Sequence, residues 1–528
     1  MKLLNRFSNY YFLFFLSIII LVACTKTEQP KSFKVENINS GWKIQSSEKL
    51  SGIEDQDISQ NGFDVSGWYE GVVPGTVMGA LSDFSVIEDA TFGINMKNMD
   101  PAQFQKPWWY RTSFEITGDD LKKNVSLRFN GINYRADLWV NGKKVVGNDE
   151  FAGSFRMFTY NINQYIQEGK NTLALKITQY ADGEYLLGFC DWNPLPTDRS
   201  MGIFREVFLE INDGIKIHSP FVYSKVDTVS KSAADLFIQA EIVNSTDKPV
   251  EGILRVNYEV GTVEKKVTVN ANETLSYRFT PDEFPQLSVQ NVNLWWPNGM
   301  GKANMYNLKT EFIANNKVLD QIDKKYGIRE IRSYLNEDKN RAFEINGKFV
   351  MPKGGGWADD IFLRDTRKSV EAQMRYIKHM GLNSIRCEGF WGKDEDLYDL
   401  CDEYGILVMI GWNCIWEWEE YLLKPCHEKY GGAVTPIDIK LLADSWKDQM
   451  LWLRNHPSIY IWMLGSDKLP HPDLEMKYVD LFDKYDPSRP YSTSAGGAGT
   501  EDNNIVAEVP LVSDISGPTG MKMLGPYA

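Results

Sequence analysis

Histidine and cysteine are scarce in this sequence, with five histidines and six cysteines among 528 residues. The histidines are scattered along the chain and no CxxC pair occurs. Five cysteines remain after Cys24, a number that cannot pair completely, so neither a zinc site nor a disulfide framework is indicated. Glycine-rich phosphate loops and dinucleotide fingerprints are also missing. We therefore predict no metal and no other cofactor.

Positively charged residues are also fewer than negatively charged ones. Lysine and arginine number 57 against 71 aspartates and glutamates, which gives a formal net charge of −14 at pH 7. Without basic clusters, a protein this acidic has no field that would attract nucleic acid or anionic substrates. We expect no nucleic-acid partner, and a neutral or cationic ligand fits the charge better.

Long apolar runs are confined to the N-terminus, since no later segment reaches the ~18 uninterrupted apolar residues of a membrane helix. Lys2 and Arg6 precede an apolar stretch at 10–22, and "LVAC" places Cys24 after a small residue. This pattern is typical of a secretory signal with a lipoprotein cleavage box. We expect removal of residues 1–23, lipidation of Cys24 and anchoring to a bacterial membrane, on the periplasmic side or the cell surface. The alternative is a single transmembrane anchor.

Two consecutive regions alternate apolar and polar residues with the period of β-strands. Residues 24–35 are polar and read as a tether, and 36–213 then contains runs such as "WWYRTSFEI" at 108–116, separated by Gly, Asn and Asp. The Asn141-Gly142 pair predicts a hairpin turn. This region predicts a jelly-roll-like β-sandwich. Residues 214–335, with about seven short strands, resemble an immunoglobulin-like sandwich.

The period changes at about residue 336, where strand and helix patterns begin to alternate. We predict helices at 366–381, 394–405, 437–456 and 473–486. The strands that they separate are predicted at 349–356, 383–387, 406–412, 459–464, 490–495 and 511–516. This order indicates a parallel sheet of the (β/α)8 type. A closed barrel needs about 250 residues, so 336–528 is expected to form an incomplete one that lacks two strands.

Polar residues follow three of the predicted parallel strands. They are Glu388, Asn413 and Asp467, the last in "RNHPSIYIWMLGSDKLPH" directly after the apolar run at 459–464. The carboxyl ends of the strands carry the active site in (β/α)8 barrels. For each residue the alternative is a helix cap. Because three polar residues follow successive predicted strands, we favour an active site over three separate helix caps.

Motifs in all three regions resemble those of glycoside hydrolase family 2, in the family's order. The motifs are "WWYR" (108–111), "FNGINYRADLWVNG" (129–142), "DRSMGIFREV" (198–207), "LWWPNGMG" (294–301), "YGIREI" (326–331), "FEINGKFVMPKGGGW" (343–357), "GLNSIRCEG" (381–389), "YGILVMIGW" (404–412) and "RNHPSIYIWMLGSD" (454–467). The resemblance runs from about residue 40 to the end. It implies a retaining glycosidase, in which two carboxyl groups about 5–5.5 Å apart act as acid/base and nucleophile.

The resemblance assigns the acid/base role to Asp467. In the family this motif usually ends in Asn-Glu, and the Ser466-Asp467 pair is similar to that of the exo-β-glucosaminidases. Such an acid must be protonated when it acts, so we expect it to be buried beside other carboxylates. Glu388 also matches the exo-β-glucosaminidases, where a carboxylate would pair with the ammonium group of a 2-amino sugar. The alternative for Glu388 is a helix cap.

The nucleophile of the family is a glutamate at the end of the seventh strand. The glutamates after Asp467 are Glu475, Glu501 and Glu508, and none occupies that position. We therefore expect the sequence to be C-terminally truncated, without the nucleophile, and the chain as given to be inactive.

Further residues are candidates for the sugar pocket. Four tryptophans lie at or just after strand ends and could stack on pyranose rings, with core packing as the alternative: Trp357, Trp391, Trp412 and Trp416. Asp359 and Asp360 are candidate ligands for hydroxyl groups, or else belong to a solvated loop. Asp198 resembles a position from which the family's first domain reaches toward the active site.

The leading prediction is a lipid-anchored exo-β-D-glucosaminidase that acts on chitosan-type oligosaccharides. A β-mannosidase or β-galactosidase of the same family is the first alternative. A non-catalytic glycan-binding lipoprotein is the second. The expected partners are an oligosaccharide and, through Cys24, a membrane.

Overall fold

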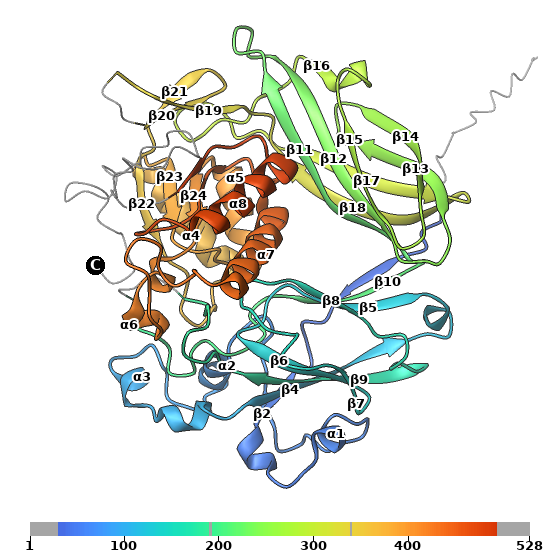
Figure 1. Cartoon of the computed structure of the whole chain (residues 1–528), viewed down its shortest axis with the longest axis vertical. Coiled ribbons are helices and arrows are strands. Elements are labelled where there is room, and N and C mark those ends of the chain that lie inside the picture. The colour runs from blue at the N-terminus through green and yellow to red at the C-terminus, as the bar shows by residue number, and fades with distance from the viewer. Residues whose placement is uncertain (1–29, 189–192, 338–340, 494–528) are drawn as a thin grey trace, which may run out of the picture.

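The computed structural model describes residues 30–188, 193–337 and 341–493. Figure 1 shows two β-sandwiches and a third region in which helices lie over a parallel sheet. The predicted fold class, two β-sandwiches followed by a (β/α)8-type region, is confirmed. In the described ranges, no helix combines the length and apolar character needed to cross a membrane.

The first sandwich pairs a six-stranded sheet, in the order β3-β2-β4-β9-β6-β7, with a four-stranded sheet, β1-β10-β5-β8. The strands are β1 (Lys34–Asn37), β2 (Lys43–Ser46), β3 (Tyr69–Glu70), β4 (Trp108–Ile116), β5 (Asn124–Phe129), β6 (Arg135–Val140), β7 (Lys143–Val146), β8 (Phe158–Asn161), β9 (Gly169–Thr178) and β10 (Val207–Asn212). The predicted Asn-Gly hairpin joins β6 to β7. Asn141 and Gly142 have φ values of 51° and 79°, as a two-residue turn of this kind requires.

Short helices fill the connections of this first domain. They are η1 (Ser47–Leu50), α1 (Asp55–Ile58), α2 (Val77–Asp83), α3 (Asn95–Asn98), η2 (Pro101–Phe104) and η3 (Asp120–Lys122). The α2 helix begins after Thr76, whose hydroxyl accepts a hydrogen bond from the N–H of Gly79. Its buried face joins the core between the two sheets.

The second sandwich packs sheet β11-β12-β15, to which β16 adds, against sheet β14-β13-β17-β18. The strands are β11 (Ile215–Val226), β12 (Ala233–Asn244), β13 (Val250–Asn257), β14 (Thr262–Val269), β15 (Thr274–Phe279), β16 (Ser288–Gln290), β17 (Tyr306–Ala314) and β18 (Lys317–Tyr326), with η4 (Pro285–Leu287) before β16. All pairings are antiparallel, and inward-facing aliphatic residues form a separate core.

The predicted strand at 349–356 is wrong, because two strands of different sheets occupy this segment. A small antiparallel sheet contains β19 (Ile331–Leu335), β20 (Arg341–Ile345) and β21 (Lys348–Val350), and β22 (Gly354–Trp357) belongs to the parallel sheet. Pro352 between them has no N–H for a ladder. At Gly354 a Cβ atom would lie 1.6 Å from the carbonyl oxygen of Ser384, so glycine permits the close approach to the next strand.

The parallel sheet has the order β22-β23-β24-β25-β26, and every neighbouring pair is parallel. Its elements after β22 are α4 (Arg367–His379), β23 (Ser384–Cys387), α5 (Asp396–Tyr404), β24 (Leu407–Gly411), η5 (Cys414–Trp416), α6 (Glu419–Leu422), α7 (Pro436–Leu453), β25 (Ile459–Met463), α8 (Pro472–Tyr485) and β26 (Tyr491–Ser492). Strand neighbours follow chain order, as in a (β/α)8 barrel. The predicted strand at 511–516 lies outside the described residues.

Two buried arginines join the sandwiches to the parallel-sheet region. Arg205 of the first domain donates to the carbonyl oxygen of Phe390 and to Oε1 of Gln449, both at 2.7 Å. Arg329, which follows the second sandwich, donates to the carbonyl oxygen of Ile459 at 3.1 Å. Both arginines are nearly inaccessible to solvent, so the motifs that contain them, at 198–207 and 326–331, hold the domains in register.

Candidate active site

The turn that carries Asp467 follows β25 and is held by the carboxylate of Glu417. Oε1 of Glu417 accepts a hydrogen bond from the N–H of Ser466 at 2.7 Å. Oε2 accepts from the N–H groups of Asp467 at 2.6 Å and Lys468 at 2.9 Å. Three successive backbone donors therefore converge on one buried carboxyl group, and this arrangement sets the direction in which residue 467 leaves the sheet.

Burial raises the pKa of Glu417 to about 8, although the three backbone donors act in the opposite direction, and the charge of Asp467 raises it further. Sequence reasoning missed this residue. It lies in "WNCIWEWEE", a segment with several acids and no clear period. Its partners are about fifty positions away, so no local signal identified it.

The side chain of Asp467 is exposed, and the predicted burial is wrong. Its Oδ2 accepts a hydrogen bond from the indole Nε1 of Trp418 at 2.9 Å. The ammonium group of Lys468 lies 4.1 Å from the centre of the Trp418 ring. Asp467 is exposed because its backbone, not its side chain, is bound to Glu417, which leaves the carboxylate pointing out of the turn.

The structure brings Glu388, which follows β23, to the same turn. Its Oε1 accepts a hydrogen bond from the Ser466 hydroxyl at 2.6 Å. The same oxygen accepts from Nη2 of Arg386 at 3.0 Å, and this guanidinium nitrogen also lies 3.0 Å from the Ser466 hydroxyl. The residues that follow β23 and β25 thus meet at one edge of the sheet, as their positions after parallel strands predicted.

Asn413 lies two residues after the end of β24, and its side chain is fully buried. Neither its amide oxygen nor its amide nitrogen has a hydrogen-bond partner within the described part of the chain. A buried amide without partners costs about 1–3 kcal/mol per group, and native proteins seldom leave one unexplained. Asn413 therefore stays a candidate binding residue.

The four predicted stacking tryptophans are core residues. Trp357, Trp391, Trp412 and Trp416 are 7%, 1%, 5% and 4% exposed and belong to one cluster. Phe155 of the first sandwich contacts two of them, with its ring centre 5.5 Å from both Trp412 and Trp416. In this structure their indole faces are covered by other side chains, so the predicted open stacking platform is wrong.

Asp359 and Asp360 occupy the loop after β22. Oδ2 of Asp359 accepts from the N–H of Gly392 at 2.9 Å, and burial raises the pKa of this carboxyl to about 7. Oδ1 of Asp360 accepts from the N–H of Phe362 at 2.9 Å. Asp359 is buried and Asp360 is half-buried, so both organise the loop, and the alternative of a freely solvated loop is wrong.

Asp198 is fully buried in the first domain. Its Oδ2 accepts from the N–H of Met78 at 2.8 Å, and its Oδ1 accepts from the N–H of Ser200 at 2.9 Å. Burial raises its pKa to about 6. Both oxygens serve the start of α2 and the adjacent turn, so the prediction that this side chain reaches toward the active site is wrong.

Several predicted features lie outside the described residues. These are Cys24, with the segment expected to be its signal peptide, and the two late glutamates, Glu501 and Glu508. Glu475 lies within α8, where burial raises its pKa. Glu475 is thus a helix residue and does not lie at a strand end.

Three family models cover most of the chain. "Glycosyl hydrolase 2 galactose-binding domain-like" matches 42–186, "Glycosyl hydrolases family 2" matches 215–329, and "Glycosyl hydrolases family 2, TIM barrel domain" matches 337–515. Two β-sandwiches and a barrel-type sheet with a carboxylate at its strand ends define a glycoside hydrolase architecture. The chain belongs to glycoside hydrolase family 2.

Similar proteins of known activity cover the same three regions. An exo-β-D-glucosaminidase of Streptomyces avermitilis is 32% identical over 92% of this chain and 52% of its own length. One from Amycolatopsis orientalis is 30% identical over 92% and 45%. The crystal structure of the exo-chitosanase CsxA of Amycolatopsis orientalis matches with a TM-score of 0.80 and 28% identity, over 88% of this chain and 53% of the other. The chain thus spans about half the length of these relatives.

Proposed function

We propose that this chain belongs to a retaining exo-β-glycosidase that is most like an exo-β-D-glucosaminidase acting on chitosan-type oligosaccharides. The observation that carries the proposal is that Glu388 and Asp467 follow strands of the same parallel sheet and that Glu388 accepts a hydrogen bond from the hydroxyl of Ser466, the residue next to Asp467. The relatives named exo-β-D-glucosaminidase support the substrate class.

In the proposed reaction, Asp467 is the general acid and then the general base. It would protonate the glycosidic oxygen of the leaving group while a second carboxylate attacks the anomeric carbon from the opposite face, and would later take a proton from the incoming water. The exposure of the Asp467 carboxylate leaves it accessible to a substrate. We assign the nucleophile to no residue of this chain. Glu417 holds the turn, and Trp418 orients the acid through its N–H.

Glu388 is the proposed partner for the ammonium group of a glucosamine unit. Charge-assisted hydrogen bonds of this kind are stronger than neutral ones and would select an amino sugar. Arg386 already pairs with Glu388, at 3.0 Å. Because the Arg386 guanidinium already compensates the charge of Glu388, this carboxylate does not require an ammonium group on the substrate. The ion pair is therefore the specific observation that favours a neutral glycone, as in a β-mannosidase. The competing proposal is therefore a β-mannosidase of the same family.

The test uses the protein encoded by the complete reading frame at its native locus. We would assay aryl β-glucosaminide, β-mannoside and β-galactoside together with chitosan oligosaccharides, and follow the first-formed anomer by proton NMR. Release of β-glucosamine from the non-reducing end supports the proposal. Preferential cleavage of the mannoside would move the assignment to the competing proposal. Sugar binding without any hydrolysis would indicate a glycan-binding protein instead.

We also propose that the protein is anchored to a bacterial membrane by a lipid on Cys24, facing the periplasm or the cell surface. The support is the sequence pattern that precedes this residue. Mass spectrometry of the membrane-extracted protein should show a diacylglyceryl group on an N-terminal Cys24. A Cys24→Ser variant should lose that mass and leave the membrane fraction. An unmodified, soluble wild-type protein would contradict the anchor.

A further inference from the structure

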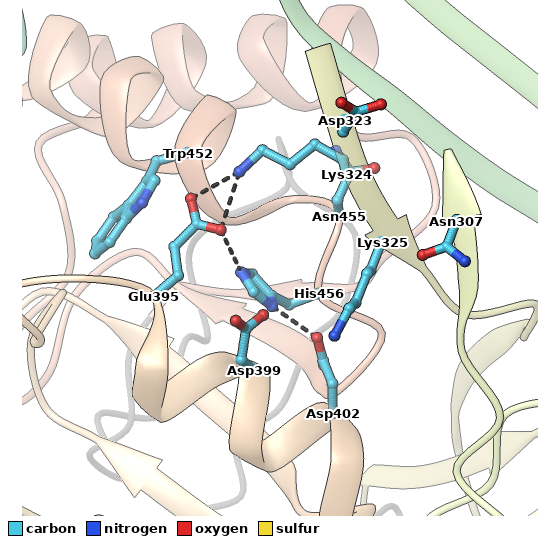
Figure 2. Close-up of a pocket in the computed structure, with 10 residues that line it drawn as sticks. All are labelled: Asn307, Asp323, Lys324, Lys325, Glu395, Asp399, Asp402, Trp452, Asn455 and His456. Carbon is cyan, nitrogen blue, oxygen red and sulfur yellow. Dashed lines mark hydrogen bonds and ion pairs between the residues drawn. The ribbon is translucent and has the colours of Figure 1, made fainter. Parts of the chain in front are cut away.

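A cavity of about 310 Å³ lies between the second sandwich and the parallel-sheet region. His456 in its wall precedes β25, whereas Asp467 of the strand-end site follows this strand. Strand β18 contributes Lys324 and Lys325 from one side. The other side comes from α5 and from the segment after α7. Figure 2 shows Glu395, Asp399 and His456 directed toward one another at the centre of this cavity.

These three side chains form a candidate ligand set. Glu395 and Asp399 are four residues apart at the start of α5, and side chains at this spacing lie on one face of a helix. His456 reaches them from the segment before β25. One potential ligand atom of each residue lies within 4.8 Å of the other two. No local pattern predicts this set, because His456 belongs to a different helix-strand unit from the two carboxylates.

The imidazole of His456 is oriented for such a role. Its Nδ1 lies 2.7 Å from Oδ2 of Asp402, and the residue is only 6% exposed. An Nδ1–H donated to that carboxylate leaves Nε2 as the free lone pair, the arrangement found behind many metal-ligating histidines. Nε2 faces Oε2 of Glu395 at 3.8 Å, beyond hydrogen-bond distance.

The charges around the cavity favour a cation. Asp323, Glu395, Asp399 and Asp402 supply four carboxylates, against the two lysines. The excess of carboxylates over ammonium groups therefore stabilises positive charge in the cavity.

We propose that Glu395, Asp399 and His456 bind a divalent metal ion of the zinc type. One imidazole nitrogen with two carboxylates is a ligand set that zinc accepts, with bonds of about 2.0–2.2 Å. At tetrahedral angles these bond lengths place two ligand atoms about 3.3–3.6 Å apart, so ligand atoms that lie within 4.8 Å of one another have to approach by up to about 1.5 Å. The cavity has room for a water as a fourth ligand.

Lys324 competes with the metal in this arrangement. Its ammonium group lies 2.7 Å from Oε1 and 2.9 Å from Oε2 of Glu395. Dashed lines mark these contacts in Figure 2. The metal ion must displace this ammonium group to reach the carboxylate. Because Lys324 belongs to the second sandwich and Glu395 to the parallel-sheet region, metal binding would replace a contact between domains by a site within one domain.

The test titrates the tag-free full chain with ZnCl2 and follows the heat by calorimetry, with Co²⁺ absorption as a report on ligand type. We expect one tight equivalent of zinc and a Co²⁺ spectrum typical of low coordination. Asp399→Asn should weaken zinc binding at least about 10-fold. Asp396→Asn is the matched control, since Asp396 lies on the same helix and contacts Arg367 but does not line the cavity. It should leave zinc binding unchanged.

The Lys324→Met variant distinguishes the proposed competition from misfolding, because the two predict opposite changes in zinc affinity. Removing the competing ammonium group should tighten zinc binding at least about 10-fold, whereas a misfolded variant would only lose affinity. Absence of a stoichiometric zinc site in the wild type and in Lys324→Met would overturn the proposal. Equal zinc affinity of Asp399→Asn and wild type, or preference for Ca²⁺ or Mg²⁺ over Zn²⁺, would overturn it as well.

Discussion

The buried carboxylate of Glu417 accepts a hydrogen bond from the backbone N–H of Asp467 at 2.6 Å, while the Asp467 side chain itself stays exposed. The two acids therefore have separate roles in one turn. Glu417 fixes the path of the backbone, and Asp467 presents a carboxylate next to Trp418 at the strand end. Each of the three backbone N–H groups would be left without a partner if the buried Glu417 carboxyl group were removed, at a cost of about 1–3 kcal/mol per group.

Glu417→Gln tests the first of these roles. A glutamine offers one acceptor oxygen for three backbone donors and places an NH2 group against the rest, so we expect a loss of about 1–3 kcal/mol of stability. Differential scanning calorimetry of the full chain measures the change as a lower unfolding midpoint. Glu419→Gln, at an exposed position of α6, is the control. Equal midpoints for the two variants would argue against a structural role for Glu417.

Asp467→Asn tests the second role, in the protein from the complete reading frame. An amide cannot donate the proton that a poor leaving group requires, so hydrolysis of chitosan oligosaccharides should fall by about 10²–10⁴-fold. Aryl glycosides with activated leaving groups should be affected less. Steady-state rates on both substrate types measure the difference, with Asp473→Asn as an exposed control on α8. Normal cleavage of oligosaccharides would show that Asp467 is not the acid.

Glu388→Gln separates the two proposed substrate classes. If Glu388 binds the ammonium group, kcat/KM should fall about 10-fold or more on aryl glucosaminides and change little on aryl mannosides. The ratio of the two kcat/KM values is the measurement. A similar loss on both substrates would mean that the Glu388–Arg386–Ser466 cluster supports the turn without selecting the sugar.

Arg205→Lys tests the junction between the first sandwich and the parallel-sheet region. A lysine cannot reproduce the bonds to Phe390 and Gln449 together, and hydrogen bonds from charged groups contribute about 1.5–3 kcal/mol each. We expect a markedly lower thermal midpoint and faster proteolysis between the domains. Arg156→Lys is the control. This arginine also bridges the two domains, through Asp448, but is 24% exposed, so its loss should cost about 1 kcal/mol or less.

Asp320→Asn tests a pH dependence of stability. Asp320 is buried in the second sandwich, where it accepts from the N–H of Ile217 at 2.6 Å, and burial raises its pKa from 3.8 to about 7. Between these two values the folded state keeps a proton that the unfolded chain releases. The free energy of unfolding therefore falls as pH rises through this window.

Asparagine carries no charge at either pH. The free energy of unfolding of wild type should therefore fall between pH 4.5 and pH 8 by more than that of Asp320→Asn. Urea unfolding at the two pH values gives the difference. The exposed Asp247 of the same domain provides the control, Asp247→Asn. A constant difference between Asp320→Asn and wild type at both pH values would contradict the assignment.

Much of the fold could be predicted because its signals are local. The period-2 run at 108–116 became β4, the Asn141-Gly142 pair became a hairpin, and the helical pattern at 394–405 became α5. The prediction of one strand at 349–356 failed because the change of sheet depends on the packing of Gly354 against Ser384, a contact between positions thirty residues apart.

The site was predicted only in part. Glu388 and Asp467 follow parallel strands, and parallel strand ends share one edge, so their meeting at Ser466 followed from topology. Glu417 was missed because its segment has no regular period and its partners come from a distant strand end. The exposure of Asp467 was also mispredicted, because exposure depends on which group of the turn Glu417 binds.

By itself, the sequence determined the order of the domains, the family and the carboxylates that follow the parallel strands, because periodicity and short motifs are encoded locally. The tertiary structure alone decided which side chains face solvent and which are buried. The four tryptophans after the strand ends are covered by residues such as Phe155 from another domain. Glu395, Asp399 and His456 come together only when α5 packs beside the segment before β25. Such contacts join positions far apart in the chain, and no local pattern records them.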